Sequence, residues 1–197
     1  MKKFTRPSWD EFFMFQAISY ATRHSCLKRG VGAVLVKNNR IIGAGYNGAA
    51  SGIENCRNKG CCHYEQLAFN EYKINGGSPD DLKEKFKIYC LAVHAEINVL
   101  SQCSRDEAIG SILYVTNYPC PKCVQDGIIT KGVSRVMVWK QYLQNPIFTI
   151  DEKRASEQKL LEAGIPIKYV KMSKGQIMGI AAYMAKNIGK RSRYNFK

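Results

Sequence analysis

Four side chains in two short motifs could together bind and use a divalent metal ion. His94 and Glu96 stand in the motif His-Ala-Glu, and Cys120 and Cys123 stand farther along the chain in Pro-Cys-Pro-Lys-Cys. One imidazole and two thiolates make a typical three-ligand set for a catalytic zinc, which keeps its fourth position for water, whereas a structural zinc usually takes four protein ligands. The motifs therefore predict an open zinc site formed by His94, Cys120 and Cys123.

Each of these motifs stands where a helix is expected to begin. A helix is predicted from His94 to about Cys103, and Pro121 suits the first turn of another helix. Two helix N-termini would then face one metal ion, and their partial positive charge favours thiolate ligands. Glu96 is expected on a different face of the same helix start, where it can exchange protons with a water molecule on the metal. The alternative is a closed structural zinc with a fourth protein ligand and Glu96 as a surface carboxylate.

The other elements predict an α/β fold in which a mixed sheet lies between two helical layers. Ser8-Trp9-Asp10-Glu11 has the pattern of a capping box and starts a helix that runs to about His24, and Asn38-Asn39 suits a tight hairpin turn. Helices alternate with the later strands, which indicates parallel pairing there. The five strands are expected at residues 31–36, 40–46, 111–116, 134–139 and 165–170, with a helix at about 155–163.

The composition indicates one globular domain with additions. The chain has 197 residues, of which 45% are apolar, so a substantial core can form. No apolar run has the length of a membrane span, and the N-terminus does not have the pattern of a signal peptide, so the protein is expected in the cytoplasm. We expect a catalytic domain at residues 1–170, a charged insertion at about 64–89 that is broken at residues 76–79, and a basic extension at 171–197 that forms a helix.

The charge is strongly positive and unevenly distributed. The net charge is +14, and residues 168–197 contain eight Lys or Arg and no Asp or Glu. This balance suits an anionic partner such as a nucleotide, a nucleic acid or an acidic membrane surface. A solvated tail without a partner explains it equally well. The helix expected in the tail could pack on the body or form a subunit contact through its apolar side chains, Ile177, Met178, Ile180, Ala181, Met184 and Ile188.

Several further stretches carry a resemblance to a known family. The chain resembles the zinc-dependent cytidine and deoxycytidylate deaminase superfamily, and within it the deoxycytidylate deaminases, from about Ser8 to Val170. Free-cytidine deaminases usually have Cys in place of His94, and tRNA adenosine deaminases typically lack the Trp-Asp-Glu and Gly-Tyr-Asn-Gly sequences. The stretches that carry the resemblance are Ser8-Trp9-Asp10-Glu11-Phe12-Phe13-Met14, Val31-Gly32-Ala33-Val34, Gly45-Tyr46-Asn47-Gly48, His94-Ala95-Glu96-Ile97-Asn98 and Tyr114-Val115-Thr116-Asn117-Tyr118-Pro119-Cys120.

The resemblance implies a cytidine deaminase-like fold and the hydrolysis of dCMP to dUMP and ammonia, which supplies the precursor of thymidylate. It implies that Glu96 moves protons between water, the cytosine ring and the leaving ammonia. Four residues would bind the substrate: Asn47, Ala95, Tyr118 and Arg23. Arg23 or Lys28 would hold the 5′-phosphate, although a merely solvated basic loop is an equal alternative.

The resemblance also suggests regulation and a second metal. Many relatives are hexamers that dCTP activates and dTTP inhibits, and a hexamer or dimer is expected here. The effector site would use Gly45, Gly48 and Arg105, with Mg²⁺ accompanying a nucleotide effector, although the glycines alone fit a turn better. A structural zinc would be held by Cys26, Cys56, Cys61 and Cys90, with Cys62 or His63 as substitutes for one ligand. Free buried cysteines are the alternative.

Two other functions fit parts of the pattern. A deaminase that acts on a base in tRNA or single-stranded DNA would use the basic tail, so nucleic acid stays open as a partner. A zinc-binding module without turnover would keep the fold alone. No membrane partner is expected.

Overall fold

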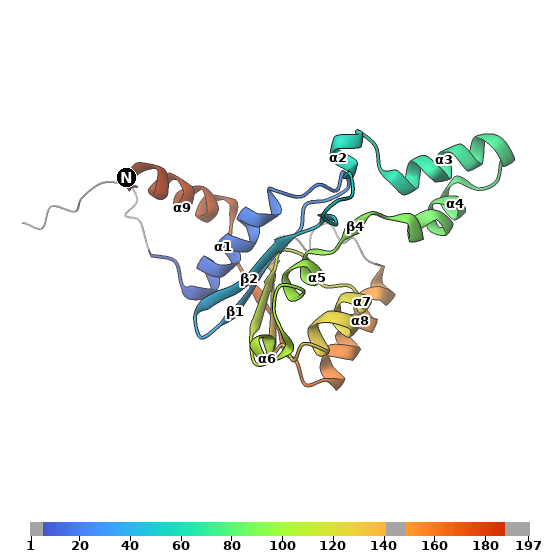
Figure 1. Ribbon diagram of the computed structural model, residues 1–197. Helices are drawn as coiled ribbons and strands as arrows, with labels where there is room; N and C mark the ends of the chain where they lie inside the picture. Colours follow the sequence, from blue (N-terminus) through green and yellow to red (C-terminus); the bar gives the residue numbers. More distant parts are fainter. Residues whose placement is uncertain (1–5, 141–148, 188–197) are drawn as a thin grey trace, which may run out of the picture.

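The computed structural model describes residues 6–140 and 149–187, and a five-stranded mixed sheet forms the centre of this part (Figure 1). The strand order is β2-β1-β5-β6-β7. β1 pairs antiparallel with β2 and β5, whereas β5, β6 and β7 run parallel to one another. The strands are β1 (Gly32–Lys37), β2 (Arg40–Tyr46), β5 (Ile112–Val115), β6 (Arg135–Trp139) and β7 (Ile167–Val170). A separate small pair joins β3 (Gly48–Ala49) to β4 (Ala92–Val93). The predicted mixed sheet is confirmed.

Helices cover both faces of the sheet and complete the predicted three layers. One face packs on α1 (Trp9–Ala21) and α9 (Lys174–Asn187), which contribute Phe13, Met14, Ile177 and Ile180 to one apolar cluster. The other face packs on α5 (Ala95–Leu100), the π-helical segment η2 (Val124–Ile129) and α8 (Ile150–Glu162). The short helices α6 (Arg105–Ala108) and α7 (Pro121–Cys123) lie within the connections on that side. Burial of these two apolar faces stabilises the sheet between them.

The local signals at the start of the chain act as predicted. The backbone N–H of Ser8 donates to Glu11 at 2.7 Å, and the N–H of Glu11 donates back to the Ser8 hydroxyl, so the capping box forms. Asn38 and Asn39 both adopt positive φ, at 52° and 57°, in the turn between β1 and β2. Both asparagines tolerate this conformation because their short polar side chains suit it.

Three helix boundaries differ from the sequence prediction, and the first is the end of α1, which lies at Ala21 rather than near His24. α8 begins at Ile150 rather than near Ala155, because Thr149 and Glu152 form another capping box that extends the helix toward its N-terminus. α5 ends at Leu100 rather than near Cys103. The hydroxyl of Ser101 donates to the Asn98 carbonyl at that end, so a side chain replaces the next helical hydrogen bond.

The segment predicted as an insertion forms a helical arm that extends from the body (Figure 1). The arm consists of α3 (His63–Asn75), α4 (Pro79–Phe86) and the 3₁₀ turn η1 (Lys87–Tyr89), and it follows α2 (Cys56–Lys59). Gly76 and Gly77 adopt positive φ between α3 and α4, and Pro79 occupies the first turn of α4 after the N-cap Ser78. The break expected at residues 76–79 is therefore the turn of this helical hairpin.

The predicted tail helix is present as α9, and its Ile177 and Ile180 pack against the body. Met178 remains 71% exposed, so the apolar side chains do not all serve that contact. Ile188, the last apolar position of the prediction, lies outside the described residues. Across residues 6–140 and 149–187, no helix combines the length and the apolar character that crossing a membrane requires.

Gly32 sets how closely α1 can lie on β1. A Cβ atom at Gly32 would lie 2.0 Å from the carbonyl oxygen of Ala17 and 2.4 Å from the amide nitrogen of Ala21, both backbone atoms of α1. We therefore expect Gly32→Ala to lower the free energy of unfolding by about 1–3 kcal/mol, as overpacking of a core does. Denaturant unfolding curves measure the change.

Gly179→Ala in α9 is the matched control. No atom lies within 4 Å of a Cβ at Gly179, so this variant should gain about 0.5–1 kcal/mol of stability from reduced backbone entropy. Equal stability of Gly32→Ala and the parent protein would show that α1 moves away without cost.

Candidate metal centre

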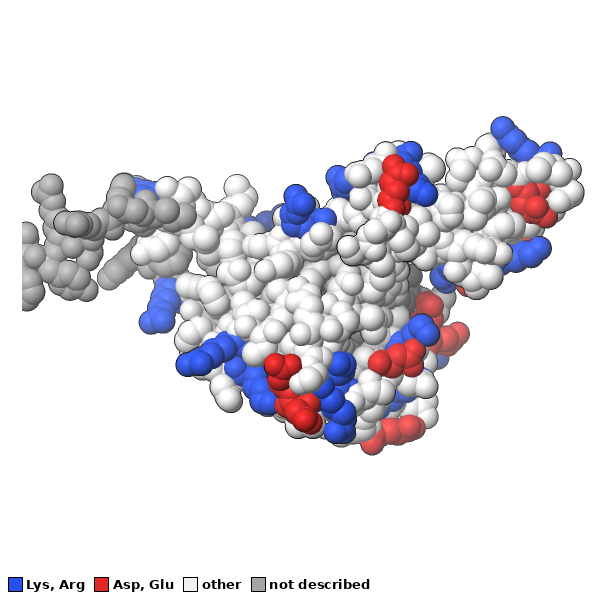
Figure 2. Space-filling view, viewed as in Figure 1, with Lys and Arg blue, Asp and Glu red and all other residues white. Residues whose placement is uncertain are grey.

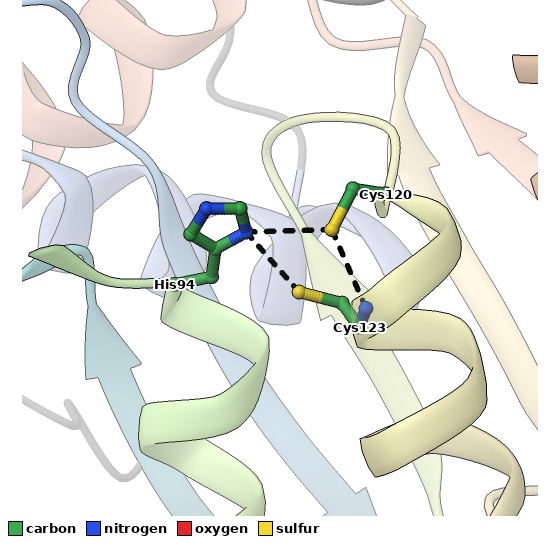
Figure 3. A group of neighbouring side chains, drawn as sticks. All are labelled: His94, Cys120 and Cys123. Carbon is green, nitrogen blue, oxygen red and sulfur yellow. Dashed lines mark hydrogen bonds between the residues drawn. The ribbon is translucent and has the colours of Figure 1, made fainter. Parts of the chain in front are cut away.

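His94, Cys120 and Cys123 come together at the start of two helices (Figure 3). The Nδ1 atom of His94 lies 3.2 Å from the Cys123 sulfur and 3.5 Å from the Cys120 sulfur. All the ligand atoms of this group lie within 4.8 Å of one another. The three predicted ligands are therefore gathered at one point, with Nδ1 as the imidazole atom that faces both sulfurs.

These separations fit one tetrahedral zinc ion. Zinc–sulfur bonds of about 2.3 Å and zinc–nitrogen bonds of about 2.0–2.1 Å place a nitrogen and a sulfur ligand roughly 3.5 Å apart. His94 is exposed and Cys123 is buried, so the group is open on the histidine side. One nitrogen and two sulfur ligands with one open side are typical of a zinc site that reacts with a substrate.

The predicted helix starts are confirmed at both motifs. His94 is the N-cap residue of α5, and Cys120 is the N-cap residue of α7, with Pro121 in the first turn. The backbone N–H of Cys123 donates to the Cys120 sulfur at 3.3 Å. Hydrogen bonds from the Cys123 thiol and from His94 lower the pKa of Cys120. The bond between the two cysteines also raises the pKa of Cys123, which is its donor. A zinc ion deprotonates both cysteines when it binds.

Glu96 lies beside this group and is buried, with only 4% of its surface exposed. The neighbouring His94 and Cys123 lower the pKa of its carboxyl group, but by less than burial raises it. Burial penalises the charged form and raises the pKa of Glu96 to about 7. A carboxyl group with a pKa near neutrality can both accept and donate a proton. Glu96 is thus a buried group beside the metal ligands, unlike the surface carboxylate of the structural-zinc alternative.

Gly127, which the motifs did not indicate, allows the two halves of the centre to meet. A Cβ at this position of η2 would lie 2.9 Å from Ile97 Cδ1 and 3.0 Å from Leu100 Cδ1, both on α5. The missing side chain lets η2 lie against α5, so Cys120 and Cys123 come within reach of His94. The π-helical geometry of η2 was also not predicted, although such segments occur frequently at functional sites. The sequence did offer one signal of this close packing, because a glycine stands in the helix predicted after the two cysteines.

Asn47 supports the loop that precedes β1. Its side-chain oxygen accepts from the Val31 N–H at 2.8 Å, and its side-chain nitrogen donates to the Arg29 carbonyl at 2.9 Å. Both side-chain polar atoms therefore engage the loop, while one amide hydrogen remains for a ligand. A Cβ at Gly48 would lie 2.2 Å from the Ser25 hydroxyl, so this loop also packs on Gly48.

The other predicted substrate residues lie at different depths. Ala95 is fully buried in the first turn of α5, and Arg23 is exposed after α1. Tyr118 is 4% exposed and belongs to the core cluster, and its hydroxyl has no hydrogen-bond partner among residues 6–140 and 149–187. Burial raises the pKa of Tyr118, and Lys153 of α8 lies 5.7 Å from its ring centre. The phenol ring therefore extends into the layer between the sheet and α8.

Lys28, the second candidate for the phosphate, is already paired. Its ammonium group lies 2.7 Å from the Glu65 carboxylate and also donates to the Tyr64 hydroxyl. Burial works against the charged form, but these hydrogen bonds outweigh it and raise the pKa of Lys28. Lys28 thus joins the loop before β1 to the first turn of α3, which leaves Arg23 as the unpaired candidate within the described residues.

The predicted effector residues serve packing in this structure. A Cβ at Gly45 would lie 3.2 Å from the Cβ of Asn98 and from the amide nitrogen of Val99, so helix α5 fills the space beside it. Arg105 begins α6, and its Nε donates to the Thr130 carbonyl after η2 at 3.1 Å. These contacts explain the glycine and the arginine without a bound nucleotide, and the effector role stays a prediction.

The four cysteines predicted for a second zinc do not form a ligand group. Within the ranges that the structure describes, His94, Cys120 and Cys123 are the set of at least three metal-binding side chains whose ligand atoms lie close together. Cys26, Cys56 and Cys61 are half-buried, and Cys90 is exposed at the end of η1. Cys26 and Cys56 nevertheless lie in neighbouring segments, because their chain neighbours are bonded: the Arg57 N–H donates to the Ser25 carbonyl at 3.2 Å.

Residues 7–140 match the family described as the cytidine and deoxycytidylate deaminase zinc-binding region. The chain belongs to this family. The match covers both motifs of the metal centre, and the family's zinc-binding character agrees with the gathered His94, Cys120 and Cys123. The family and the gathered side chains together support Zn²⁺ as the metal of this region.

Relatives within the deaminase family are similar over most of the described chain. The deoxycytidylate deaminase of Mycobacterium phage D29 is 38% identical over 139 residues, which are 70% of this chain and 98% of that protein. The deoxycytidylate deaminase of Schizosaccharomyces pombe is 41% identical over 141 residues, but the match spans only 38% of its length. The dCMP deaminase of cyanophage S-TIM5, solved with dCMP and dUMP, superposes with a TM-score of 0.56 at 25% identity. That superposition covers 85% of this chain and 100% of the cyanophage chain.

Removal of one thiolate tests the metal centre directly. We expect Cys123→Ser to bind about one zinc ion per chain fewer than the parent protein, because an alcohol is a much poorer zinc ligand than a thiolate. Cys103→Ser is the matched control, since Cys103 is also buried but lies outside the ligand group. Elemental analysis after dialysis against a weak chelator gives the ratio. Unchanged zinc in Cys123→Ser would remove this cysteine from the site.

Proposed function

We propose that this protein is a dCMP deaminase, which hydrolyses dCMP to dUMP and ammonia and so supplies the precursor of thymidylate. The observation that carries the proposal is the buried Glu96 beside the open group of His94, Cys120 and Cys123. The similarity to the phage D29 deoxycytidylate deaminase, over 98% of that protein, supports the choice of substrate. The likeness to a cyanophage deaminase solved with dCMP and dUMP supports it further. The same proposal places the protein in the cytoplasm.

The residues of the site have separate tasks in this reaction. Bound zinc supplies the activation of a water molecule at neutral pH. Glu96 accepts one proton from the attacking water and gives it to ring nitrogen N3. It then takes the second proton from the new C4 hydroxyl group and gives it to the leaving amino group. The bond from water oxygen to C4 forms, the bond from C4 to the amino nitrogen breaks, and ammonia leaves. The pKa of Glu96 near 7 suits both directions of transfer.

The remaining polar groups select the nucleotide. Asn47 uses its free amide hydrogen on the deoxyribose or the base, while its other bonds hold the loop before β1. Ala95 offers its backbone at the start of α5, and Tyr118 borders the position of the cytosine ring. Arg23 binds the 5′-phosphate, because Lys28 is paired with Glu65.

We expect the protein to release ammonia from dCMP faster than from dCTP, cytidine, single-stranded DNA or tRNA. Glu96→Gln should lower kcat by about a hundredfold or more, the loss that follows removal of a general acid–base group. Its zinc content should equal that of the parent protein. Ammonia release and elemental analysis on the same samples give both values.

The other outcomes of this assay identify the alternatives. Turnover of polynucleotide alone would indicate a nucleic-acid base deaminase, and no turnover of any substrate would indicate a zinc-binding module. On the face shown in Figure 2, Lys and Arg side chains are interspersed with Asp and Glu rather than joined in one basic surface. A mixed surface of this kind favours a small nucleotide over a long polyanion.

A second, structural zinc completes the proposed cofactors. Cys26, Cys56, Cys61 and Cys90 are not gathered in the structure and would have to close around the ion to supply four thiolates, with Cys62 or His63 as a substitute. The contact of α2 with the residue beside Cys26 supports this assignment. We expect two zinc ions per chain in the parent protein and one in Cys56→Ser, whose zinc at His94 remains. Elemental analysis that gives a single zinc in the parent protein would overturn this part of the proposal.

The family also suggests how the protein assembles and how its activity is regulated. We propose a homo-oligomer, a hexamer or a dimer, in which dCTP with Mg²⁺ activates and dTTP inhibits. Gly45, Gly48 and Arg105 would border the effector. The exposed apolar side chains of the arm, which include Phe69 and Tyr72, are available for a subunit contact.

A further inference from the structure

The edge strand β2 forms hydrogen bonds with side chains at the end of α5, the helix that follows His94, and in the turn after it. β2 lies at one end of the sheet and pairs with β1 on one side only. The N–H of Ala44 donates to the side-chain oxygen of Gln102 at 3.2 Å, and the side-chain nitrogen of Gln102 donates to the Ala44 carbonyl at 2.7 Å. One amide group thus engages both polar atoms of a single edge residue, as a neighbouring strand would.

Two more side chains extend the same row. The Asn98 side-chain nitrogen donates to the Tyr46 carbonyl at 2.7 Å, and the Cys103 thiol donates to the Ile42 carbonyl at 3.3 Å. The strand residues that these groups reach alternate along β2, which is the spacing of backbone groups that point to the same edge. The end of α5 and the turn after it therefore take the place of a sixth strand.

Close packing makes these bonds possible. A Cβ at Gly43 would lie 3.0 Å from the Val99 carbonyl, and one at Gly45 would lie 3.2 Å from the Val99 amide nitrogen. These two glycines alternate with the bonded residues, so α5 can lie directly on β2. The side chains of Asn98 and Gln102 are short enough to reach the strand only because the helix lies so close.

The position of α5 matters because this helix carries half of the metal centre. α5 has six residues, begins after the metal-binding residue His94 and contains Glu96. A helix this short is not stable by itself, so tertiary contacts determine its position. Its buried Val99 and Leu100 resist separation from the core but do not select one position along β2. Directional hydrogen bonds to Ala44 and Tyr46 do select one.

We propose that Gln102, together with Asn98, is a positioning residue of the zinc site: its amide bonds to the backbone of edge strand β2 set the register of α5, and with it His94 and Glu96. The proposal rests on the deaminase function for its catalytic consequence, but not for its effect on the metal ligands. Gln102 touches neither substrate nor metal in this scheme and acts only through the helix.

Gln102→Met tests the proposal, because methionine has a similar length but no amide. Gln158→Met is the matched control, since Gln158 is also exposed and, among the described residues, its amide bonds to Glu162 within α8. Three measurements apply to each variant: exchange of the Ala44 amide hydrogen by NMR, the visible spectrum of the cobalt-substituted protein, and kcat and KM for dCMP.

In Gln102→Met we expect the Ala44 amide to exchange at least about tenfold faster and the cobalt bands to shift, because the amide bond to the strand is lost. We expect kcat to fall about tenfold with KM nearly unchanged, since a misplacement of about 1 Å at a reacting group can cost a hundredfold. Gln158→Met should match the parent protein in all three measurements. Gln102→Glu keeps the shape and the acceptor for the Ala44 N–H but loses the donor to the Ala44 carbonyl. If Gln102→Met does not fold, Gln102→Glu should keep the Ala44 amide protected but still show the shifted cobalt bands and the lower kcat.

A folded Gln102 variant with unchanged cobalt bands and unchanged kcat would overturn the proposal, even if its melting temperature were lower. Such a result would mean that Gln102 only stabilises the edge of the sheet. If the parent protein does not turn over dCMP, the proposed function fails, while amide exchange and the cobalt spectrum still decide the role of Gln102.

Discussion

The close packing of helix α5 on both of its sides is the constraint on which the metal centre depends. On one side, Gly43 and Gly45 leave room for the helix against β2, and on the other, Gly127 leaves room for η2. Each contact brings backbone or side-chain atoms within about van der Waals distance, so a methyl group at any of the three positions would require a shift. The distance between His94 and the two cysteines is therefore set by glycines that never touch the metal.

This packing places charged groups where their environment changes their chemistry. The N-terminal ends of α5 and α7 both face the centre, and the backbone of Cys123 donates to the Cys120 sulfur. These contacts favour a thiolate at Cys120, while burial makes the charged form of Glu96 unfavourable. Within one small site, hydrogen bonds thus stabilise negative charge on Cys120, while burial keeps a proton available on the neighbouring carboxyl group of Glu96.

The start of the helical arm contacts the loop before β1 through polar side chains. Lys28 joins the loop before β1 to Tyr64 and Glu65 at the start of α3, and Asn47 and Ser25 hold the same loop near β3. The ammonium group is half-exposed, so the pair contributes modestly to stability and mainly fixes where the arm leaves the body. The loop before β1 is therefore held from both sides.

The sequence by itself determined the order of most elements and the group of candidate zinc ligands, because those depend on short-range patterns. Capping at Ser8, the turn at Asn38 and Asn39, and the alternation of later helices and strands predicted the mixed sheet. The spacing of His94, Cys120 and Cys123 at predicted helix starts was sufficient to predict the site. The cap at Thr149 was also local, but the prediction missed it and placed the start of α8 too late.

Only the tertiary structure decided which polar side chains remain available and which glycines control the distances. Lys28 carries the right charge for a phosphate, but its pairing with Glu65 depends on residues 37 positions apart in sequence. Asn47, Gln102 and Gly127 likewise act on partners from other elements. A local pattern cannot specify such contacts, because they arise only when the sheet and its helices pack together.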